Sequence, residues 1–198
     1  MNPALLLVIS GPSGVGKGTI CRELQKLDPT IYLSVSVTTR PPREGEKEGK
    51  DYYFVSEDRF RELMEQGELL EWARVYDYFY GTPRTAVNKA RAAGRDVLLE
   101  IDVQGGLKVR ENCPDSILLF VLPPSLEDLS IRLKRRGTES SDSIDSRLRW
   151  AESELPYYKQ YDYVVVNDTV AEAVAKVSAI RIAEKCRPQN QKLVWPIT

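Results

Sequence analysis

The chain has 198 residues and a formal net charge of −1, so its length suits one folded domain and its charge balance argues against general nucleic-acid binding. We expect no membrane span and no signal peptide, because no apolar run approaches ~20 residues and the first residues lack a basic segment. Histidine is absent, and Cys21, Cys113 and Cys186 lack metal-ligand spacing, which indicates reduced thiols in a cytoplasmic protein.

A glycine-rich segment, here called the phosphate loop, follows the first predicted strand. The apolar run 4–9 is typical of a buried parallel strand, and Ile20, Leu24 and Leu27 recur afterwards at helical spacing. Glycines between a strand and a helix let backbone N–H groups surround phosphate oxygens, and a lysine adds a mobile cation. The segment predicts a nucleoside triphosphate site made of Gly11, Pro12, Ser13, Gly14, Val15, Gly16, Lys17, Gly18 and Thr19.

The residue after Lys17 departs from the usual pattern. Ser or Thr normally follows the lysine and helps to hold Mg²⁺. This chain has Gly18 there and brings a hydroxyl one residue later, at Thr19. We therefore expect this loop to hold the metal through water rather than directly.

Residues 34–83 are interpreted as a small inserted lobe, here called the insert lobe. Residues 31–37 alternate at period two and predict one strand, and residues 38–51 are charged and predict an exposed loop. Further elements are predicted in order: a strand at 53–55, a helix at 56–67 capped by Ser56, and strands at 69–75 and 78–82.

Strands and helices then alternate, which predicts an α/β fold with a mostly parallel sheet of about five strands and helices on both faces. The predicted helices are 85–93, 105–112, 125–136, 144–158 and 170–185, and the strands are 96–102, 116–122 and 163–166. We expect one domain with a core (1–33, 84–124 and 159–186), the insert lobe, a helical lid (125–158) and a polar tail (187–198) to which no element is assigned.

Polar residues follow two of the predicted core strands. Ligands of an open parallel sheet lie beyond the carboxyl ends of its strands. Glu100 and Asp102 end one strand, and Asn167 and Asp168 follow another. Together with Thr19, the first two carboxylates are candidate metal ligands, directly or through water, although either could instead pair with a surface lysine.

Two arginines three residues apart mark the exposed loop of the insert lobe. Prolines flank Arg40 and Arg43, which suit the capture of a phosphate, although a solvated basic loop would show the same residues. Tyr52 and Tyr80 could add phenolic donors or could be half-buried sheet aromatics.

A carboxylate interrupts the apolar strand 69–75 at Glu71. Such a group needs a partner. The ring N–H and the exocyclic amine of guanine are adjacent donors that match two carboxylate oxygens, whereas adenine presents a bare ring nitrogen. Glu71 is therefore a candidate purine discriminator.

Arginines are dense in the predicted lid. Charged helix faces are usually only solvated, but such a cluster can also close over a triphosphate and neutralise charge during transfer. The cluster comprises Arg132, Arg135, Arg136 and Arg147.

Taken together, the chain resembles the guanylate kinase family from about Leu6 to about Ala183. The resemblance rests on seven ordered blocks: GPSGVGKGT, SVTTRPPREGEKEGKDYYFV, LLEWA, FYGTP, LLEIDVQG, RLKRRGTE and VVVND. It implies Mg²⁺-dependent transfer of the γ-phosphoryl group of ATP to GMP, and to dGMP as well. Two departures stand out: Thr82 replaces a frequent serine, and Gly18-Thr19 resembles adenylate kinase.

The resemblance also implies roles for individual residues. Lys17, Arg40, Arg136 and Arg147 would be catalytic. The triphosphate site would add Arg132, Arg136, Asn167 and Asp168 to the phosphate loop. The GMP site would comprise Ser36, Arg40, Arg43, Tyr52, Glu71, Tyr80, Thr82 and Asp102.

Two alternatives remain beside this reading. One is a non-catalytic scaffold module that binds peptides, although the phosphate loop with Lys17 is intact here. The other is a related kinase with a different phosphate acceptor, against which Glu71 and Asp102 argue. Monomer and homo-oligomer both stay open.

Overall fold

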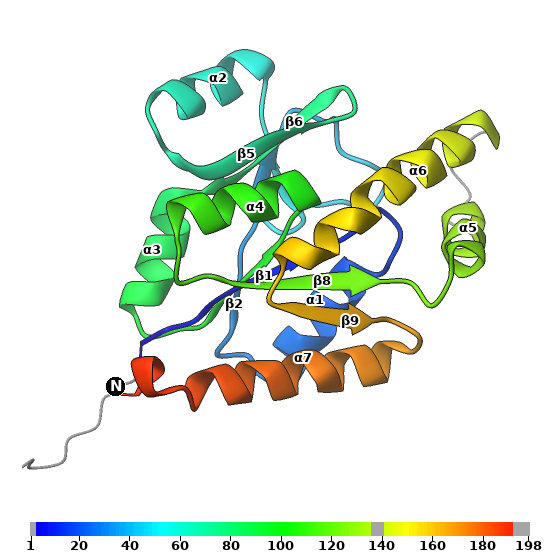
Figure 1. The fold of residues 1–198 in the computed structure, drawn as a ribbon. Coiled ribbons are helices and arrows are strands. Elements are labelled where there is room, and N and C mark those ends of the chain that lie inside the picture. Colours follow the sequence, from blue (N-terminus) through cyan, green and yellow to red (C-terminus); the bar gives the residue numbers. More distant parts are fainter. Residues whose placement is uncertain (1–2, 136–140, 192–198) are drawn as a thin grey trace, which may run out of the picture.

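The computed structural model describes residues 3–135 and 141–191, and within them five parallel strands form the larger sheet. Its order is β2-β7-β1-β8-β9, with β1 in the centre, and this arrangement confirms the predicted α/β fold (Figure 1). The bounds are β1 Leu6–Ser10, β2 Tyr32–Leu33, β7 Val97–Glu100, β8 Ile117–Leu122 and β9 Tyr163–Val166.

Alternate residues of β1 enter two separate cores, one on each face of the sheet. Leu7 and Ile9 pack with α1 (Lys17–Leu27) and α7 (Val170–Lys185). Leu6 and Val8 pack instead with α3 (Arg84–Ala92) and α4 (Val103–Asn112). Burial on both faces explains the unbroken apolar run of this strand, and it fixes the position of the loop that follows β1.

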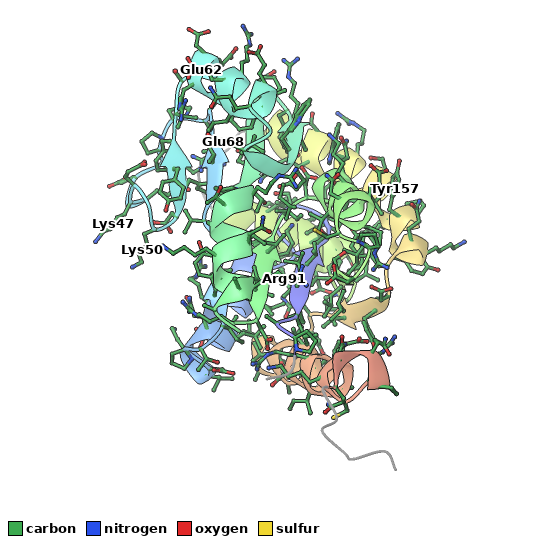
Figure 2. The ribbon with its side chains drawn as sticks, turned by 90° about the vertical axis from the view of Figure 1, so that its left-hand side faces the viewer. Lys47, Lys50, Glu62, Glu68, Arg91 and Tyr157 are labelled. Atoms are coloured by element: carbon green, nitrogen blue, oxygen red, sulfur yellow. The ribbon has the colours of Figure 1, made fainter. Side chains whose placement is uncertain are left out.

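The insert lobe carries a second, mixed sheet in the order β4-β3-β6-β5, packed against α2 (Glu57–Glu65). Its strands are β3 Ser36–Thr38, β4 Tyr52–Phe54, β5 Leu69–Val75 and β6 Tyr78–Pro83. Lys47 and Lys50, in the loop between β3 and β4, point away from the molecule (Figure 2).

The single strand predicted at 31–37 is wrong. The chain leaves the larger sheet after β2, which pairs with β7, and enters the smaller sheet at β3, which pairs with β4 and β6. The alternation persists across the break because Leu33 of β2 packs against the main core, as Ile31 just before the strand does, while Val37 of β3 lies in the core of the lobe. A local pattern does not reveal which sheet a strand joins.

Helices α5 (Leu126–Arg135) and α6 (Ser141–Glu154) lie on the side to which the arrows of β8 and β9 point (Figure 1). The helix predicted to reach residue 158 is α-helical only to Glu154 and continues as a 3₁₀ turn, Leu155–Gln160. Pro156 lies in that turn, and proline has no N–H with which to continue an α-helix.

Side-chain caps begin three helices as predicted. The Thr169 hydroxyl accepts from the N–H of Glu172, Ser56 caps α2, and Ser125 accepts from the N–H of Asp128. The tail contributes a short 3₁₀ turn, Pro188–Asn190, and residues 192–198 lie outside the described part. In the described ranges, every helix is too short or too polar to cross a bilayer.

Asp96 joins α7 to the larger sheet. Its carboxylate is 3% exposed, and it accepts from Arg181 Nε at 2.6 Å, Lys185 Nζ at 2.7 Å and the Leu5 N–H at 3.1 Å. Since Asp96→Ala leaves two cations near an apolar gap, we expect the free energy of unfolding in urea to fall by about 3 kcal/mol.

Glu62→Ala provides the control for this prediction. Glu62 lies on the outside of α2 and pairs with Arg59 in solvent (Figure 2). Its loss should change stability by less than about 0.5 kcal/mol. Equal effects of the two variants would contradict the role assigned to Asp96.

Candidate active site

One cavity lies beyond the carboxyl ends of β1 and β7, between the phosphate loop, the insert lobe and α6. Residues from these three parts face one another across it, although they lie far apart in sequence. Its lining comprises Gly11, Ser13, Gly14, Gly16, Lys17, Gly18, Ser36, Arg40, Arg43, Tyr52, Glu71, Val75, Tyr76, Tyr80, Glu100, Ile101, Asp102, Arg147, Trp150 and Glu154.

Lys17 is folded beneath the phosphate loop, at the first turn of α1. Its ammonium group donates to the carbonyl oxygens of Gly11 at 2.6 Å and Pro12 at 3.0 Å. Burial lowers the pKa of Lys17 below its usual value, and the charges of Glu100, Glu154 and Asp102 oppose that decrease. The lysine therefore contacts the loop directly and is stabilised in its charged form by nearby carboxylates that line the same cavity.

Gly18 makes room for a carboxylate. A Cβ atom at this position would meet Glu100 Oε1 at 2.9 Å and Oε2 at 3.0 Å. The side chain of Glu100 thus occupies space close to that of the Ser or Thr usual in such loops. Thr19 is exposed and lines an adjoining cavity, which Glu100 also borders.

Glu46 and Tyr52 fix the position of the Arg40 guanidinium group. Its guanidinium donates to Glu46 Oε1 at 2.8 Å and lies 5.3 Å from the centroid of the Tyr52 ring. The rings of Tyr52 and Tyr80 meet edge to face at 5.9 Å, and burial raises the pKa of Tyr52 to about 12. These groups form a cationic and phenolic wall that suits an anionic ligand.

Glu71 is 5% exposed and is fixed by Thr82, whose hydroxyl donates to Glu71 Oε1 at 2.7 Å. Burial raises the pKa of Glu71 to about 7. Gly105, in the first turn of α4, lets the carboxylate approach, since a Cβ there would lie 2.7 Å from Glu71 Oε2. Thr82 is fully buried and reaches the cavity through Glu71.

Asp102 caps the N-terminus of α4, close to Gly105 and Glu71. Its Oδ1 accepts from the N–H of Gly105 at 2.6 Å, and burial raises the pKa of its carboxyl group. Asp102 therefore has one oxygen committed to the helix and still lines the cavity beside Glu71.

The lid arginines divide into two groups. Arg147 of α6 donates to Ser13 Oγ of the phosphate loop at 2.7 Å and lines the cavity. Arg132 of α5 donates instead to the carbonyl oxygens of Asn167 and Asp168, at 2.9 and 3.3 Å. Arg136 lies outside the described residues.

Asn167, which follows β9, holds the phosphate loop through a hydrogen bond. It is buried, and its side-chain amide donates to the Val15 carbonyl oxygen at 2.7 Å. Neither Asn167 nor Asp168 is among the residues that line the cavity, so their predicted contact with adenine stays a prediction.

The sequence analysis missed several residues of this site. Glu46 accepts from Arg40 and also from the N–H of Arg43 at 2.7 Å, which orders the loop. Trp150 and Glu154 line the cavity from α6, and Tyr76 lines it from the β5–β6 turn. Helical spacing of four residues could have placed Trp150 and Glu154 on one face, whereas the position of Tyr76 has no local signal.

A phosphate loop after the central strand of a parallel sheet, facing a cationic wall on an inserted lobe, defines a phosphate-loop kinase of small acceptors. The sequence model described as guanylate kinase matches residues 4–184. The chain therefore belongs to the guanylate kinase family.

Individual relatives agree with this membership. The chain is 53% identical over 188 residues to a guanylate kinase from Caldanaerobacter subterraneus subsp. tengcongensis, covering 95% of this chain and 91% of that protein. It is 50% identical over 194 residues to one from Desulfitobacterium hafniense, covering 98% and 97%. A crystal structure of guanylate kinase from Anaplasma phagocytophilum matches with a TM-score of 0.81 at 37% identity, covering 97% and 92% of the two chains.

The raised pKa of Glu71 predicts a pH-dependent stability. Between the usual pKa of 4.5 and about 7, the folded chain keeps a proton that the unfolded chain releases, so the free energy of unfolding falls as pH rises through this window. Glu71→Gln removes this decrease. Its stability relative to the unchanged protein should grow by about 3 kcal/mol across the window, at 1.36 kcal/mol per pKa unit.

Urea unfolding of both proteins at pH values below and above the window measures this change. Taking the difference between the two proteins cancels the titrating groups that do not interact with Glu71, so the measured change belongs to Glu71 together with its neighbour Asp102. A difference that stays constant with pH would show that Glu71 titrates normally.

Proposed function

We propose that this chain transfers the γ-phosphoryl group of ATP to GMP, and to dGMP as well, giving ADP and GDP. The observation that carries the proposal is the shared cavity, in which Lys17 of the phosphate loop faces Arg40 and Glu71 of the insert lobe. Its relatives are guanylate kinases by name, and the chain covers nearly all of their length.

The insert lobe supplies the groups that a purine monophosphate needs. Arg40, Arg43, Tyr52 and Tyr80 would bind the phosphate, since guanidinium and phenolic groups donate to anionic oxygens. Glu71 would accept from the two adjacent donors of guanine, with Ser36, Thr82 and Asp102 beside it. Because Thr82 already orients Glu71, the carboxylate is preorganised for those donors.

The phosphate loop and the lid supply the groups for ATP. Lys17 and the backbone N–H groups of the loop would bind the outer phosphates, and Arg147 approaches them through Ser13. We extend this role to Arg132 and Arg136, with Asn167 and Asp168 near the adenine.

The residues around Gly18 suit Mg²⁺ in their chemistry, because carboxylate and hydroxyl oxygens are its preferred ligands. Glu100 lies directly beside Gly18 and borders both cavities, while Asp102 lines the main cavity and Thr19 lines the adjoining one. In the described parts of the chain, no three His, Cys, Asp or Glu side chains are grouped as a ligand set for a metal ion. The ion would neutralise charge on the phosphates of ATP.

The chemistry requires little beyond positioning. The attacking oxygen of GMP is already anionic, so transfer needs no strong general base, consistent with the absence of histidine. Lys17, Arg40 and Arg147 would neutralise the charge on the two phosphates and bring them into line.

The free thiols Cys21, Cys113 and Cys186 support a reducing, cytoplasmic location.

A coupled nucleotide assay tests the reaction. We expect ATP turnover to depend on added GMP and to be far weaker with AMP, CMP or UMP, since guanine alone among these bases is a purine with two adjacent donors for Glu71. Turnover with a different acceptor would identify another kinase, and no turnover with any acceptor would favour a peptide-binding module.

Lys17→Ala should lower kcat by about 10²–10³-fold, because it removes the mobile cation at the transferring phosphoryl group. The unfolding midpoint should change little in the same preparation. Lys26→Ala, which removes an exposed lysine paired with Glu23 at the other end of α1, is the matched control and should retain full activity. Comparable kcat in both variants would refute the role of Lys17.

Glu71→Gln should raise the KM for GMP about 10–100-fold, with a smaller change in kcat, because the new amide presents a donor to one of the two guanine donors. Glu68→Gln changes an exposed carboxylate of the same lobe and should leave the KM unchanged (Figure 2). If Glu71→Gln leaves purine choice untouched, the assignment of this carboxylate is wrong.

A further inference from the structure

One face of α4 lies against β5, the strand that carries Glu71 (Figure 1). Three residues of α4 with helical spacing share this face: Gly105, Lys108 and Asn112. Gly105 leaves the space that Glu71 Oε2 occupies. Lys108 and Asn112 do not line the cavity, but both donate to the backbone of β5.

Lys108 is joined to Trp72 in two ways. Its ammonium group donates to the Trp72 carbonyl oxygen at 2.6 Å and lies 4.4 Å from the centroid of the Trp72 ring. A charged donor makes a stronger hydrogen bond than a neutral one, and the face of an indole ring attracts the same cation. The two contacts together hold the backbone one residue after Glu71.

Asn112 holds the backbone on the other side of Glu71. Its side-chain amide donates to the Leu70 carbonyl oxygen at 2.8 Å. Because Asn112 is exposed, water competes for this bond, and we expect it to hold the strand less firmly than Lys108 does. The carbonyl groups of Leu70 and Trp72 thus flank Glu71, and the same helix binds both.

The pairing of β5 explains why these bonds matter. In the described ranges β5 is the edge strand of the smaller sheet and pairs with β6, so carbonyl groups on its outer edge have no partner within the sheet. The register with β6 also shifts between Leu69 and Glu71. Such an irregularity disrupts the ladder and re-aims a side chain. The direction of Glu71 therefore depends on what binds the outer edge of its strand.

Recognition of guanine requires that direction to be fixed. The ring N–H and the exocyclic amine are adjacent donors in one plane, and a carboxylate accepts from both only when its two oxygens face them. Thr82 binds one oxygen of Glu71, but the position of the whole side chain follows its backbone. In an aligned site, a misplacement of about 1 Å can cost about 10²-fold.

We propose that Lys108 and Asn112 are positioning residues for purine specificity, which fix the Glu71 carboxylate toward guanine by binding the carbonyl groups on either side of it. Both act through Glu71 and contact no substrate. Because α4 packs against the main sheet, these bonds join Glu71 to the core as well as to the insert lobe. The inference deepens the proposed transfer to GMP and rests on the role of Glu71 in it.

IMP separates this role from a general loss of structure. Its base keeps the ring N–H of guanine and lacks the exocyclic amine, so Glu71 accepts from one donor rather than two. A displaced carboxylate loses two bonds to GMP and one to IMP, and the preference for GMP over IMP falls. A lower stability of the fold changes both affinities alike.

The measurement is the dissociation constant of GMP and of IMP, by calorimetry, for the full chain. Lys108→Met keeps the apolar stem and removes the donor, so we expect GMP to bind about tenfold more weakly and the preference over IMP to fall about fivefold. Asn112→Ala should lower the preference about twofold to threefold, since its bond is exposed. The KM for ATP should change by less than about twofold in both variants, because the phosphate loop is untouched.

Arg84→Met is the matched control. Arg84 is half-buried like Lys108 and donates from α3 to the carbonyl oxygens of Leu69 at 2.9 Å and Gly67 at 3.1 Å. These bonds hold the same segment on the other side of the register shift from Glu71. We expect a lower unfolding midpoint and a preference for GMP over IMP that changes by less than about twofold. An equal loss of preference in Arg84→Met and Lys108→Met would overturn the proposal.

A double variant tests whether Lys108 acts through Glu71. Once Glu71→Gln has removed the carboxylate, its direction no longer matters, so adding Lys108→Met should change the preference by less than about twofold. Full addition of the two effects would overturn the proposal. An unchanged preference in a folded Lys108→Met variant would overturn it as well, and Asn112→Ala, at an exposed position, remains as an independent test.

The failure of this inference is distinguishable from the failure of the proposed function. GMP-dependent ATP turnover by the unchanged chain tests the function, whereas the dissociation constants require no transfer. Turnover that persists together with an unchanged preference in Lys108→Met and Asn112→Ala would refute the positioning role and leave the function standing.

Discussion

Cationic side chains from three separate parts of the chain converge on one cavity, and the chemistry of the site follows from that convergence. Lys17 comes from the phosphate loop, Arg40 from the insert lobe and Arg147 from α6. Two phosphate groups that approach each other repel strongly, and fixed positive charge in a cavity shielded from water compensates for that repulsion. Each cation is held by a protein oxygen before any nucleotide arrives.

The packing of the sheet makes this convergence possible. β1 is buried on both faces, so the loop that follows it has one position relative to α1 and β8. Asn167, at the end of β9, holds the same loop through Val15. The insert lobe has its own small core around Phe60, so it is a separate packing unit beside the main sheet. Rigid support on one side and a separately packed lobe on the other suit a site that closes on its substrates.

The buried carboxylates of this site act in two ways, by accepting from a ligand or by stabilising Lys17. Glu71 and Asp102 lie buried at the first turn of α4, where helix N–H groups favour negative charge, and burial still raises the pKa values of both. Such groups gain most from a ligand that brings donors, and guanine does so. The charges of Glu100 and Glu154 instead favour the ammonium form of Lys17, and they oppose the decrease of its pKa that burial causes.

Much of the fold could be predicted from local pattern. The strand at 163–166 and the helix at 170–185 have the predicted bounds, because apolar runs and a capping box act over a few residues. The break between β2 and β3 could not be predicted, because pairing partners are distant in sequence. For the same reason, the sequence does not reveal the contact of Tyr76 with Trp150 or the position of Glu100 beside Gly18. Residue types and spacing identify the groups of a site, while their mutual arrangement depends on the whole fold.

The most direct test of the central claim is a crystal structure with GMP and a non-hydrolysable ATP analogue bound together. The account predicts that guanine contacts Glu71, that the GMP phosphate contacts Arg40 and Tyr80, and that this phosphate faces the outer phosphates of the analogue at Lys17. A monophosphate bound away from Arg40, Arg43 and Glu71, or two nucleotides whose phosphates do not meet in this cavity, would contradict it.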